Sequence, residues 1–227
     1  MRLLVLIVAL SWLPAFSSAA ANERPPLSRI VSLAPHLTEL AFAAGAGERI
    51  VGTVEYSDYP EAARRIPRVG DAFLIDMERI VAIAPDAILV WDTGTPQQTI
   101  ERLRTLGLRV EVFSTQRLSE VAGALRRLGA LAGTQAIAVR AADRFEADIQ
   151  ALRARYESRP PITVFLQIND QPLYTVNDQQ ILSEIVSLCG GRNVFADLNE
   201  LAPAIGVEAV IAADPQAIVS TDASVTD

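Results

Sequence analysis

One segment of this chain is repeated, and the repeat constrains the fold more than any other feature of the sequence. Residues 78–92 and 208–222 match at a constant offset of 130 residues. Each copy predicts a short helix that begins near a glutamate, a turn at a proline and a buried strand that ends at an aspartate. A single long duplication predicts two similar α/β lobes, because a solenoid would need shorter periods and more copies. The identical pairs are Glu78/Glu208, Ala82/Ala212, Pro85/Pro215, Ala87/Ala217, Ile88/Ile218 and Asp92/Asp222.

Short apolar strands alternate with helices in both halves of the chain. This alternation favours an α/β fold with a doubly wound, Rossmann-like parallel sheet in each lobe. Two facing lobes enclose a cleft, and clefts between domains are favoured ligand sites. Strands are expected at 30–33, 50–54, 109–113 and 163–167, and helices at 38–44, 96–106, 118–131 and 181–188.

The N-terminus has the pattern of a secretory signal peptide. Arg2 precedes an apolar run from Leu3 to Phe16, and small residues continue to Ala21. The run is shorter than the roughly 20 apolar residues that span a membrane. We therefore expect an exported protein and cleavage after Ala21, with Ala19 and Ala20 as alternative sites. No cysteine lies at this junction, which disfavours a lipid anchor.

A stretch without glycine or proline, residues 134–159, lies between the two halves. Gly133 precedes it and Pro160 follows it, so a helix can begin and end at these points. Such a helix would span about 37 Å and hold the lobes more stiffly than a Gly/Ser-rich linker. The expected organisation is a signal peptide at 1–21, a first lobe at 22–133, a connecting helix at 134–159 and a second lobe at 160–227.

Composition disfavours several functions. The formal net charge of −7 argues against nucleic acid, because phosphate binding needs clustered Lys and Arg. The single histidine and single cysteine are too few for a zinc or iron site with several such ligands. The chain also lacks the glycine-rich phosphate loops and the nucleophile elbow of common α/β enzymes. We therefore expect no catalytic residue, metal site or cofactor. The competing hypotheses are a Rossmann-like enzyme and an interaction module without a small ligand.

The second copy of the repeat stops early. After Asp92 the first copy continues with a helix, a strand and another helix, whereas five residues follow Asp222. We therefore expect a C-terminal lobe that is incomplete. Cys189 has no partner in this sequence. In an exported protein such a cysteine pairs with another chain, stays a free thiol or has lost its partner, and we prefer the third interpretation.

Aromatic residues gather at predicted strand ends and loops, where α/β sheets bind ligands. Tyr56, Phe73, Trp91 and Tyr174 offer the broad apolar contact that suits a bulky ligand, although core or interlobe packing would also explain several of them. His36 follows the first predicted strand. For this histidine we prefer a role in lining or capping the loop to one in catalysis.

Glu78 and Glu208 begin equivalent helices in the two copies. A carboxylate in the first turn is stabilised by the helix dipole by roughly 0.3–1 kcal/mol, which alone would explain both. The functional hypothesis is that they form a matched acidic pair, one on each lobe. Such a pair would orient a partner that carries two cationic pockets.

Several motifs resemble those of a known family across essentially the whole mature chain. They look like the periplasmic cobalamin-binding proteins of ABC importers, within the helix-linked (class III) binding proteins that carry corrinoids, haem and ferric siderophores. The motifs are IVSLAPHLTELAFAAG at 30–45, YSDYP at 56–60, MERIVA at 77–82 with Pro85-Asp86, VFLQ at 164–167 and Cys189-Gly190-Gly191.

The resemblance implies two lobes joined by one helix, with cobalamin captured between them and delivered to a permease dimer in the inner membrane. It implies that Tyr56, Trp91 and Tyr174 line the cleft. It also implies that Glu78 and Glu208 dock on arginines of the two permease subunits. We expect the protein to act in the periplasm as a monomer.

Two departures from the family leave the ligand open. Ala72, next to Phe73, and Ala202 stand where the family has cleft tryptophans. Another corrinoid, haem or a ferric siderophore therefore remains an alternative to cobalamin. Cys189 matches the family's disulfide cysteine, whose partner would lie beyond Asp227.

Overall fold

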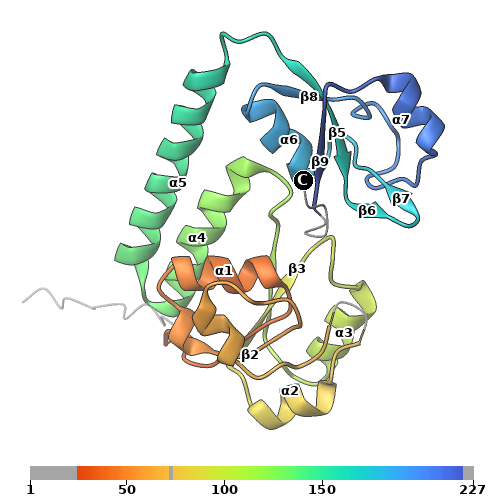
Figure 1. Cartoon of the computed structure of the whole chain (residues 1–227). Coiled ribbons are helices and arrows are strands. Elements are labelled where there is room, and N and C mark those ends of the chain that lie inside the picture. The colour runs from red at the N-terminus through yellow and green to blue at the C-terminus, as the bar shows by residue number, and fades with distance from the viewer. Residues whose placement is uncertain (1–24, 72–73, 222–227) are drawn as a thin grey trace, which may run out of the picture.

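The computed structural model describes residues 25–71 and 74–221, which form two α/β lobes joined by one long helix (Figure 1). The first lobe contains β1 (Ile30–Ser32), α1 (Pro35–Ala43), β2 (Ile50–Thr53), α2 (Met77–Ile83), β3 (Ala87–Trp91), α3 (Gln97–Thr105), β4 (Val110–Phe113) and α4 (Leu118–Ala132). The long helix is α5 (Gln135–Tyr156). The second lobe contains β5 (Ile162–Gln167), β6 (Asn169–Asp170), β7 (Leu173–Tyr174), α6 (Ile181–Leu188), β8 (Gly191–Asn193), α7 (Val207–Ala213) and β9 (Ala217–Ser220).

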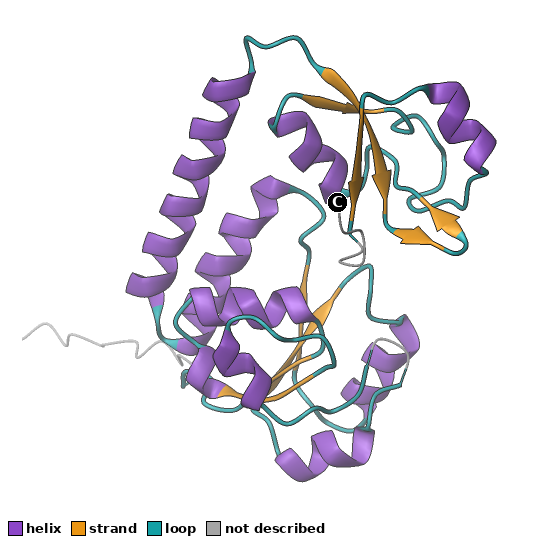
Figure 2. Cartoon of the chain, viewed as in Figure 1, coloured by secondary structure: helices purple, strands orange, loops and turns teal. Residues whose placement is uncertain are grey.

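The first lobe is a parallel sheet between two helical layers (Figure 2). Its strands have the order β2-β1-β3-β4. Successive residues of β3 face opposite sides, so Leu89 packs into the core beneath α1, α4 and α5 while Ile88 packs into the core beneath α2 and α3. Both side chains are fully buried, as is typical of a central strand covered on both faces.

The second lobe has a smaller parallel sheet with the order β8-β5-β9. Its centre is Phe165 of β5, which is buried and packs edge to face against Phe195 at 5.7 Å between ring centroids. β3 pairs with β1 and β4, whereas β9 pairs with β5 alone among the described strands. Ile218 of β9 is accordingly 60% exposed, while Ile88, its counterpart in the repeat, is fully buried.

The sequence repeat corresponds to a repeated structure. Both α2 and α7 end at a residue in the left-handed conformation, Ala84 (φ 49°) and Asp214 (φ 41°). In the following turns, Asp86 Oδ2 accepts a 2.9 Å hydrogen bond from a backbone N–H just before β1, and Gln216 Oε1 accepts one of the same length from the N–H of Thr163 in β5. Each copy therefore ties its own strand to the first strand of its lobe.

Two local predictions were wrong. Helix α1 begins at Pro35, not near Thr38, because proline fits the first turn, where its missing N–H leaves no bond unmade. Thr38 is buried, and its hydroxyl lies 2.8 Å from that of Thr53 in β2. No strand was predicted within 168–174, but this segment contains a short antiparallel pair, in which Asn169 lies opposite Tyr174.

Helix α5 runs alongside α4 and carries the chain from one lobe to the other (Figure 1). Gly133 ends α4 with φ 67°. Arg126 of α4 then binds both Asp143 and Glu146 of α5 at 2.8 Å, which aligns the two helices. None of the helices within 25–71 and 74–221 has the length and apolarity needed to cross a membrane.

Candidate ligand-binding cleft

A cavity of about 150 Å³ lies at the carboxyl ends of three strands of the first sheet. Leu33 follows β1, Val54 follows β2 and Trp91 ends β3, and all three line this cavity, which we call the first-lobe cavity. Ligands of parallel α/β sheets bind beyond the carboxyl ends of the strands. The position of the cavity is therefore that of a ligand site.

A smaller cavity of about 80 Å³ lies between the lobes. Trp91 and Gln116 line it from the first lobe, and Gln180 and Leu201 line it from the second. We call it the interlobe cavity. Because Trp91 lines both cavities, its ring marks the point where the first-lobe surface meets the cleft between the lobes.

The ring of Trp91 is held by its neighbours. His36 packs against it edge to face, with 5.0 Å between ring centroids and an interplanar angle of 80°. Thr95 Oγ1 accepts the backbone N–H of Trp91 at 3.1 Å. Gly94 leaves room for the ring, since a Cβ at this position would lie 1.9 Å from Trp91 Cε3. The indole N–H is buried and has no acceptor among the described residues, so it is a donor that a ligand carbonyl could engage.

His36 is the second residue of α1 and is half-buried beside Trp91. Its Nε2 lies 3.1 Å from the hydroxyl of Thr115. Burial lowers the pKa of His36 below its usual value, and the carboxylate of Asp92 offsets this in part. The imidazole is therefore neutral at neutral pH, and it lines the first-lobe cavity.

Tyr56 lines the same cavity from the loop after β2. Its side chain is 83% exposed, and its backbone has φ 64°. A left-handed conformation is uncommon for a bulky residue, and such strain is often found at functional sites. Tyr174 lies half-buried in β7 and is not among the residues that line either cavity. Phe73 and Ala72 fall outside the described residues.

Gln116 and Gln180 were not among the residues expected at the site. Gln116 lies just before α4, and Gln180 is the N-cap of α6, where its Oε1 accepts the N–H of Leu182 at 2.9 Å. Gln116 lies between the end of β4 and the start of α4. Loops that follow the carboxyl end of a strand form the ligand-binding edge of a parallel sheet, so this place in the sequence is a signal that could have indicated Gln116. Nothing local shows that the two glutamines face one cavity, because they come from different lobes.

The first-lobe cavity has an acidic lining, and the interlobe cavity is lined by uncharged side chains among the described residues. Glu55 and Asp71 line the first-lobe cavity, and neither lining includes a lysine or arginine among the described residues. The described part of the chain also has no group of three or more His, Cys, Asp and Glu side chains placed to hold a metal ion. The chemistry of the cleft is thus aromatic, amide-bearing and weakly acidic.

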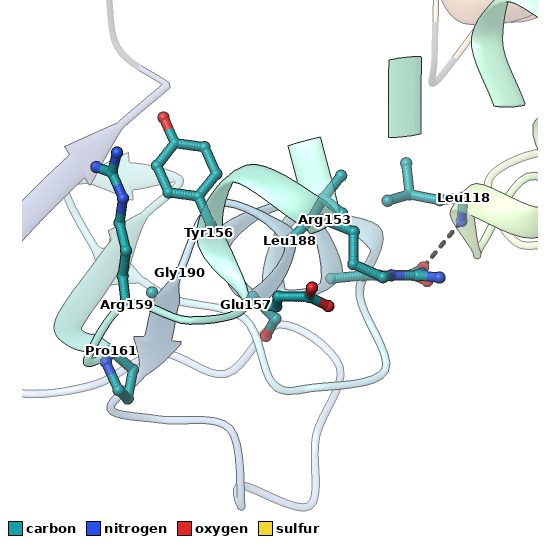
Figure 3. A pocket seen from close by; sticks show the side chains of 11 residues that line it. Leu118, Arg153, Tyr156, Glu157, Arg159, Pro161, Leu188 and Gly190 are labelled. Carbon is teal, nitrogen blue, oxygen red and sulfur yellow. Dashed lines mark hydrogen bonds between the residues drawn. The ribbon is translucent and has the colours of Figure 1, made fainter. Parts of the chain in front are cut away.

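A larger cavity of about 390 Å³ lies elsewhere, between the end of α5 and α6 (Figure 3). Pro161, just before β5, and Gly191, at the start of β8, line it together with Tyr156. It therefore lies at the amino ends of the second-lobe strands, opposite to the edge where α/β sheets bind ligands. We assign the candidate site to the cleft for this reason.

The two glutamates of the repeat occupy equivalent places in the structure. Glu78 is the second residue of α2 and Glu208 the second residue of α7, and both are exposed. Figure 1 shows α7 on the side of the second lobe away from α5. Cys189 ends α6, is exposed and forms no disulfide among the described residues.

Two parallel-sheet lobes joined by one helix, with an aromatic cleft at their strand ends, define a helix-linked substrate-binding protein. The chain belongs to the periplasmic binding protein family, which matches residues 30–226.

Comparison with individual proteins gives the same family. The chain is 35% identical to a vitamin B12-binding protein of Vibrio cholerae over 226 residues, which cover 99% of this chain and 81% of that protein. It is 38% identical to a vitamin B12-binding protein of Yersinia pestis over 215 residues, which cover 95% of this chain and 74% of that protein. These relatives are binding proteins, which confirms the expectation of a binding protein over an enzyme.

Solved structures agree with this assignment. The crystal structure of the periplasmic vitamin B12-binding protein of Vibrio cholerae matches with a TM-score of 0.82 and 38% identity, over 87% of this chain and 77% of that one. A periplasmic haem-binding protein of Pseudomonas aeruginosa matches with a TM-score of 0.79 and 26% identity, over 88% of this chain and 74% of that one.

Proposed function

We propose that this protein captures cobalamin between its lobes and delivers it to an ABC importer. One observation carries the proposal. The chain has a cleft at the strand ends, where Trp91 lines both cavities, and it is 35% identical to a vitamin B12-binding protein over 99% of its length. Capture is non-covalent, since the site supplies aromatic faces and amides and no catalytic constellation is expected.

Haem is the second candidate, because a haem-binding protein shares the fold at 26% identity. Haem carries two propionate carboxylates, which call for cationic partners. The described linings offer Glu55 and Asp71 instead. Two like charges about 4 Å apart repel by roughly 4 kcal/mol at an effective dielectric constant near 20. The charge of the cleft therefore favours cobalamin, whose corrin ring carries neutral carboxamides.

We assign separate roles to the residues of the cleft. Trp91 forms the floor beneath the ring, Tyr56 covers it from the solvent side, and His36 keeps Trp91 in place. We also propose ligand contact for Tyr174 and for Phe73, although Tyr174 lines neither cavity and Phe73 lies outside the described residues. The conformation and exposure of Tyr56 support its role, because a strained and exposed aromatic side chain stabilises the folded protein little.

We assign permease docking to Glu78 and Glu208. Their equivalent positions at the start of α2 and α7 support this role, since one exposed carboxylate on each lobe can meet one subunit of a permease dimer. Complementary charges at these points would fix the orientation of the complex.

Export completes the proposal. Residues 1–21, which lie outside the described residues, would direct the chain to the periplasm. A periplasmic location fits the family. The mature protein would then consist of a first lobe at 22–133, the connector at 134–159 and a second lobe from 160. We also propose that Cys189 forms a disulfide, in keeping with the oxidising compartment.

Tryptophan fluorescence tests the proposed function. The given sequence has two tryptophans, and Trp12 lies in the expected signal peptide, so Trp91 is the one tryptophan of residues 22–227 and their fluorescence reporter. We expect cyanocobalamin to quench Trp91 in a saturable manner and an equimolar free tryptophan derivative to show only weak, linear quenching. Linear quenching of the protein as well would contradict capture at this cleft.

A further inference from the structure

The interlobe cavity is lined by uncharged side chains from both lobes. Besides Trp91 and Leu201 it is lined by the hydroxyl-bearing Thr115 and by glutamines, and no charged side chain is among its described lining residues. At about 80 Å³ it has room for a few heavy atoms, not for a ring system. It therefore suits a small peripheral group of a ligand that lies on the Trp91 side.

The amide of Gln116 has a fixed orientation. Its Nε2 donates a hydrogen bond of 3.2 Å to Oδ2 of Asp92. A carboxylate only accepts hydrogen bonds, so the nitrogen and not the oxygen must face Asp92. The Oε1 of Gln116 is then left as an acceptor on the first-lobe side of the cavity.

The amide of Gln180 has the complementary orientation. Its Oε1 accepts the backbone N–H of Leu182 in the first turn of α6 at 2.9 Å. A backbone N–H only donates, so the oxygen must face it and the Nε2 is left as a donor. Gln180 and Gln116 are both half-buried, and both line the interlobe cavity.

We propose that Gln116 and Gln180 form a recognition site for a primary carboxamide. Gln116 contributes to it from the first lobe and Gln180 from the second. A ligand carboxamide donates its N–H to Gln116 Oε1 and accepts from Gln180 Nε2, so both protein groups are satisfied. A ligand carboxylate can only accept, so it leaves Gln116 Oε1 unpaired and brings a negative charge toward Asp92. The cleft thus selects amide-bearing corrinoids over carboxylate-bearing ones. This inference rests on the proposed function. It adds that the carboxamides of the ligand are the groups by which the cleft distinguishes it from carboxylate-bearing corrinoids.

Closure of the lobes is part of this recognition. The donor and the acceptor come from different lobes, so the two hydrogen bonds form together only when the lobes have the separation seen here. A ligand with the correct group therefore stabilises the closed arrangement by more than one without it.

Two corrinoids that differ in all their peripheral acyl groups provide the test. Dicyanocobinamide carries carboxamides around the ring, and dicyanocobyrinic acid carries carboxylates in their place. Binding of each is followed by quenching of Trp91. We expect the wild-type protein to bind dicyanocobinamide at least about 10-fold more tightly, which is the usual cost of leaving a buried polar group unpaired.

Gln180→Glu isolates the donor. Glutamate keeps an oxygen for the N–H of Leu182 and replaces the Nε2 by a second oxygen. We expect about 10-fold or greater loss of dicyanocobinamide affinity, with the thermal midpoint nearly unchanged. Gln135→Glu is the matched control, because Gln135 is exposed at the start of α5, lines neither cavity and undergoes the same change in charge. Its affinity should fall by less than about 3-fold.

The possible outcomes distinguish a failure of the carboxamide inference from a failure of the proposed function. Equal affinity for the amide and the acid, or equal losses in Gln180→Glu and Gln135→Glu, would overturn the carboxamide site while capture of corrinoids stands. Failure of the wild-type protein to bind cyanocobalamin and dicyanocobinamide alike would overturn both.

Discussion

The carboxylate of Glu184 in α6 accepts a hydrogen bond of 2.8 Å from the backbone N–H of Leu118, the first residue of α4 (Figure 3). Glu184 belongs to the second lobe and Leu118 to the first, so this bond joins the lobes. Arg117 adds an ion pair with Glu184 at 3.6 Å and a hydrogen bond to the carbonyl oxygen of Asp178 at 3.2 Å. A carboxylate at a helix N-terminus pairs an otherwise unbonded N–H and is favoured by the helix dipole. Glu184 therefore helps to set the separation of the lobes at the cleft.

Glu184→Ala removes the acceptor and leaves the N–H of Leu118 unpaired. We expect the free energy of unfolding to fall by about 1–2 kcal/mol and the spread of lobe separations to widen, as measured by urea unfolding and small-angle X-ray scattering. Asp148→Ala is the control, since its 3.9 Å contact with Arg144 joins two largely exposed side chains. An unaltered scattering profile for Glu184→Ala would mean that this bond does not hold the lobes.

Tyr56→Ala should separate binding from stability. The side chain is 83% exposed, so its loss should change the free energy of unfolding by less than about 0.5 kcal/mol. Burying an aromatic ring against a ligand contributes roughly 1.5–3 kcal/mol, so the dissociation constant for cyanocobalamin should rise about 10–100-fold. Tyr59→Ala, in the same loop and 68% exposed, should leave it unchanged. Similar losses in both variants would argue against a specific contact at Tyr56.

Gly94→Ala should displace the ring of Trp91. The added Cβ would lie 1.9 Å from Trp91 Cε3, far inside contact distance, so the ring must move. We expect a shifted emission maximum of Trp91 and at least about 10-fold weaker binding of cyanocobalamin. Gly123→Ala in α4 is the control, because a Cβ there meets nothing within 4 Å, and it should stabilise the helix by about 0.5–1 kcal/mol. Wild-type emission and affinity in Gly94→Ala would contradict the arrangement around Trp91.

His36 should make the stability depend on pH. Burial lowers its pKa in the folded protein below 6.5, and Asp92 only partly offsets this. The unfolded chain then binds the proton more readily. The contribution of His36 to the free energy of unfolding is therefore full above pH 6.5 and is lost as the pH falls toward the lower folded-state pKa. His36→Asn should flatten this part of the profile in urea unfolding between about pH 7 and pH 5. Parallel profiles for the two proteins would count against a buried, neutral His36.

Glu78→Lys combined with Glu208→Lys should abolish docking without affecting capture. Reversed charges at both positions would repel cationic pockets on the permease. We expect stimulation of the importer's ATPase activity to be lost, while quenching of Trp91 by cyanocobalamin is preserved. Glu101→Lys with Glu157→Lys makes the same change in net charge at exposed positions on α3 and at the end of α5. Stimulation by the double mutant at the wild-type level would disprove the docking role.

The architecture could be predicted where the sequence pattern is strong and local. The repeat, the alternation of strands and helices and the uninterrupted run of α5 were sufficient to predict it, and α6 has the bounds that were expected for it. The start of α1 was misplaced because Thr38 has the residue type of a cap, whereas Pro35 begins the helix. The pair β6 and β7 was missed because four residues carry too little periodicity to indicate strands.

The site could be predicted only in part. Trp91, Tyr56 and His36 follow strand ends, so their positions are fixed by local order along the chain. Gln116 and Gln180 could not be found this way, because their shared cavity exists only where the two lobes approach each other. That approach depends on long-range contacts such as the bond from Leu118 to Glu184.

Calorimetric titration tests the central claim most directly. The mature protein is titrated with cyanocobalamin and, in a parallel experiment, with haemin. We predict saturable heat with one cyanocobalamin bound per chain and at least about 100-fold weaker binding of haemin, because the described lining of the cleft offers carboxylates and no lysine or arginine for its propionates. Absence of heat with cyanocobalamin at high micromolar concentration, or tighter binding of haemin, would contradict it.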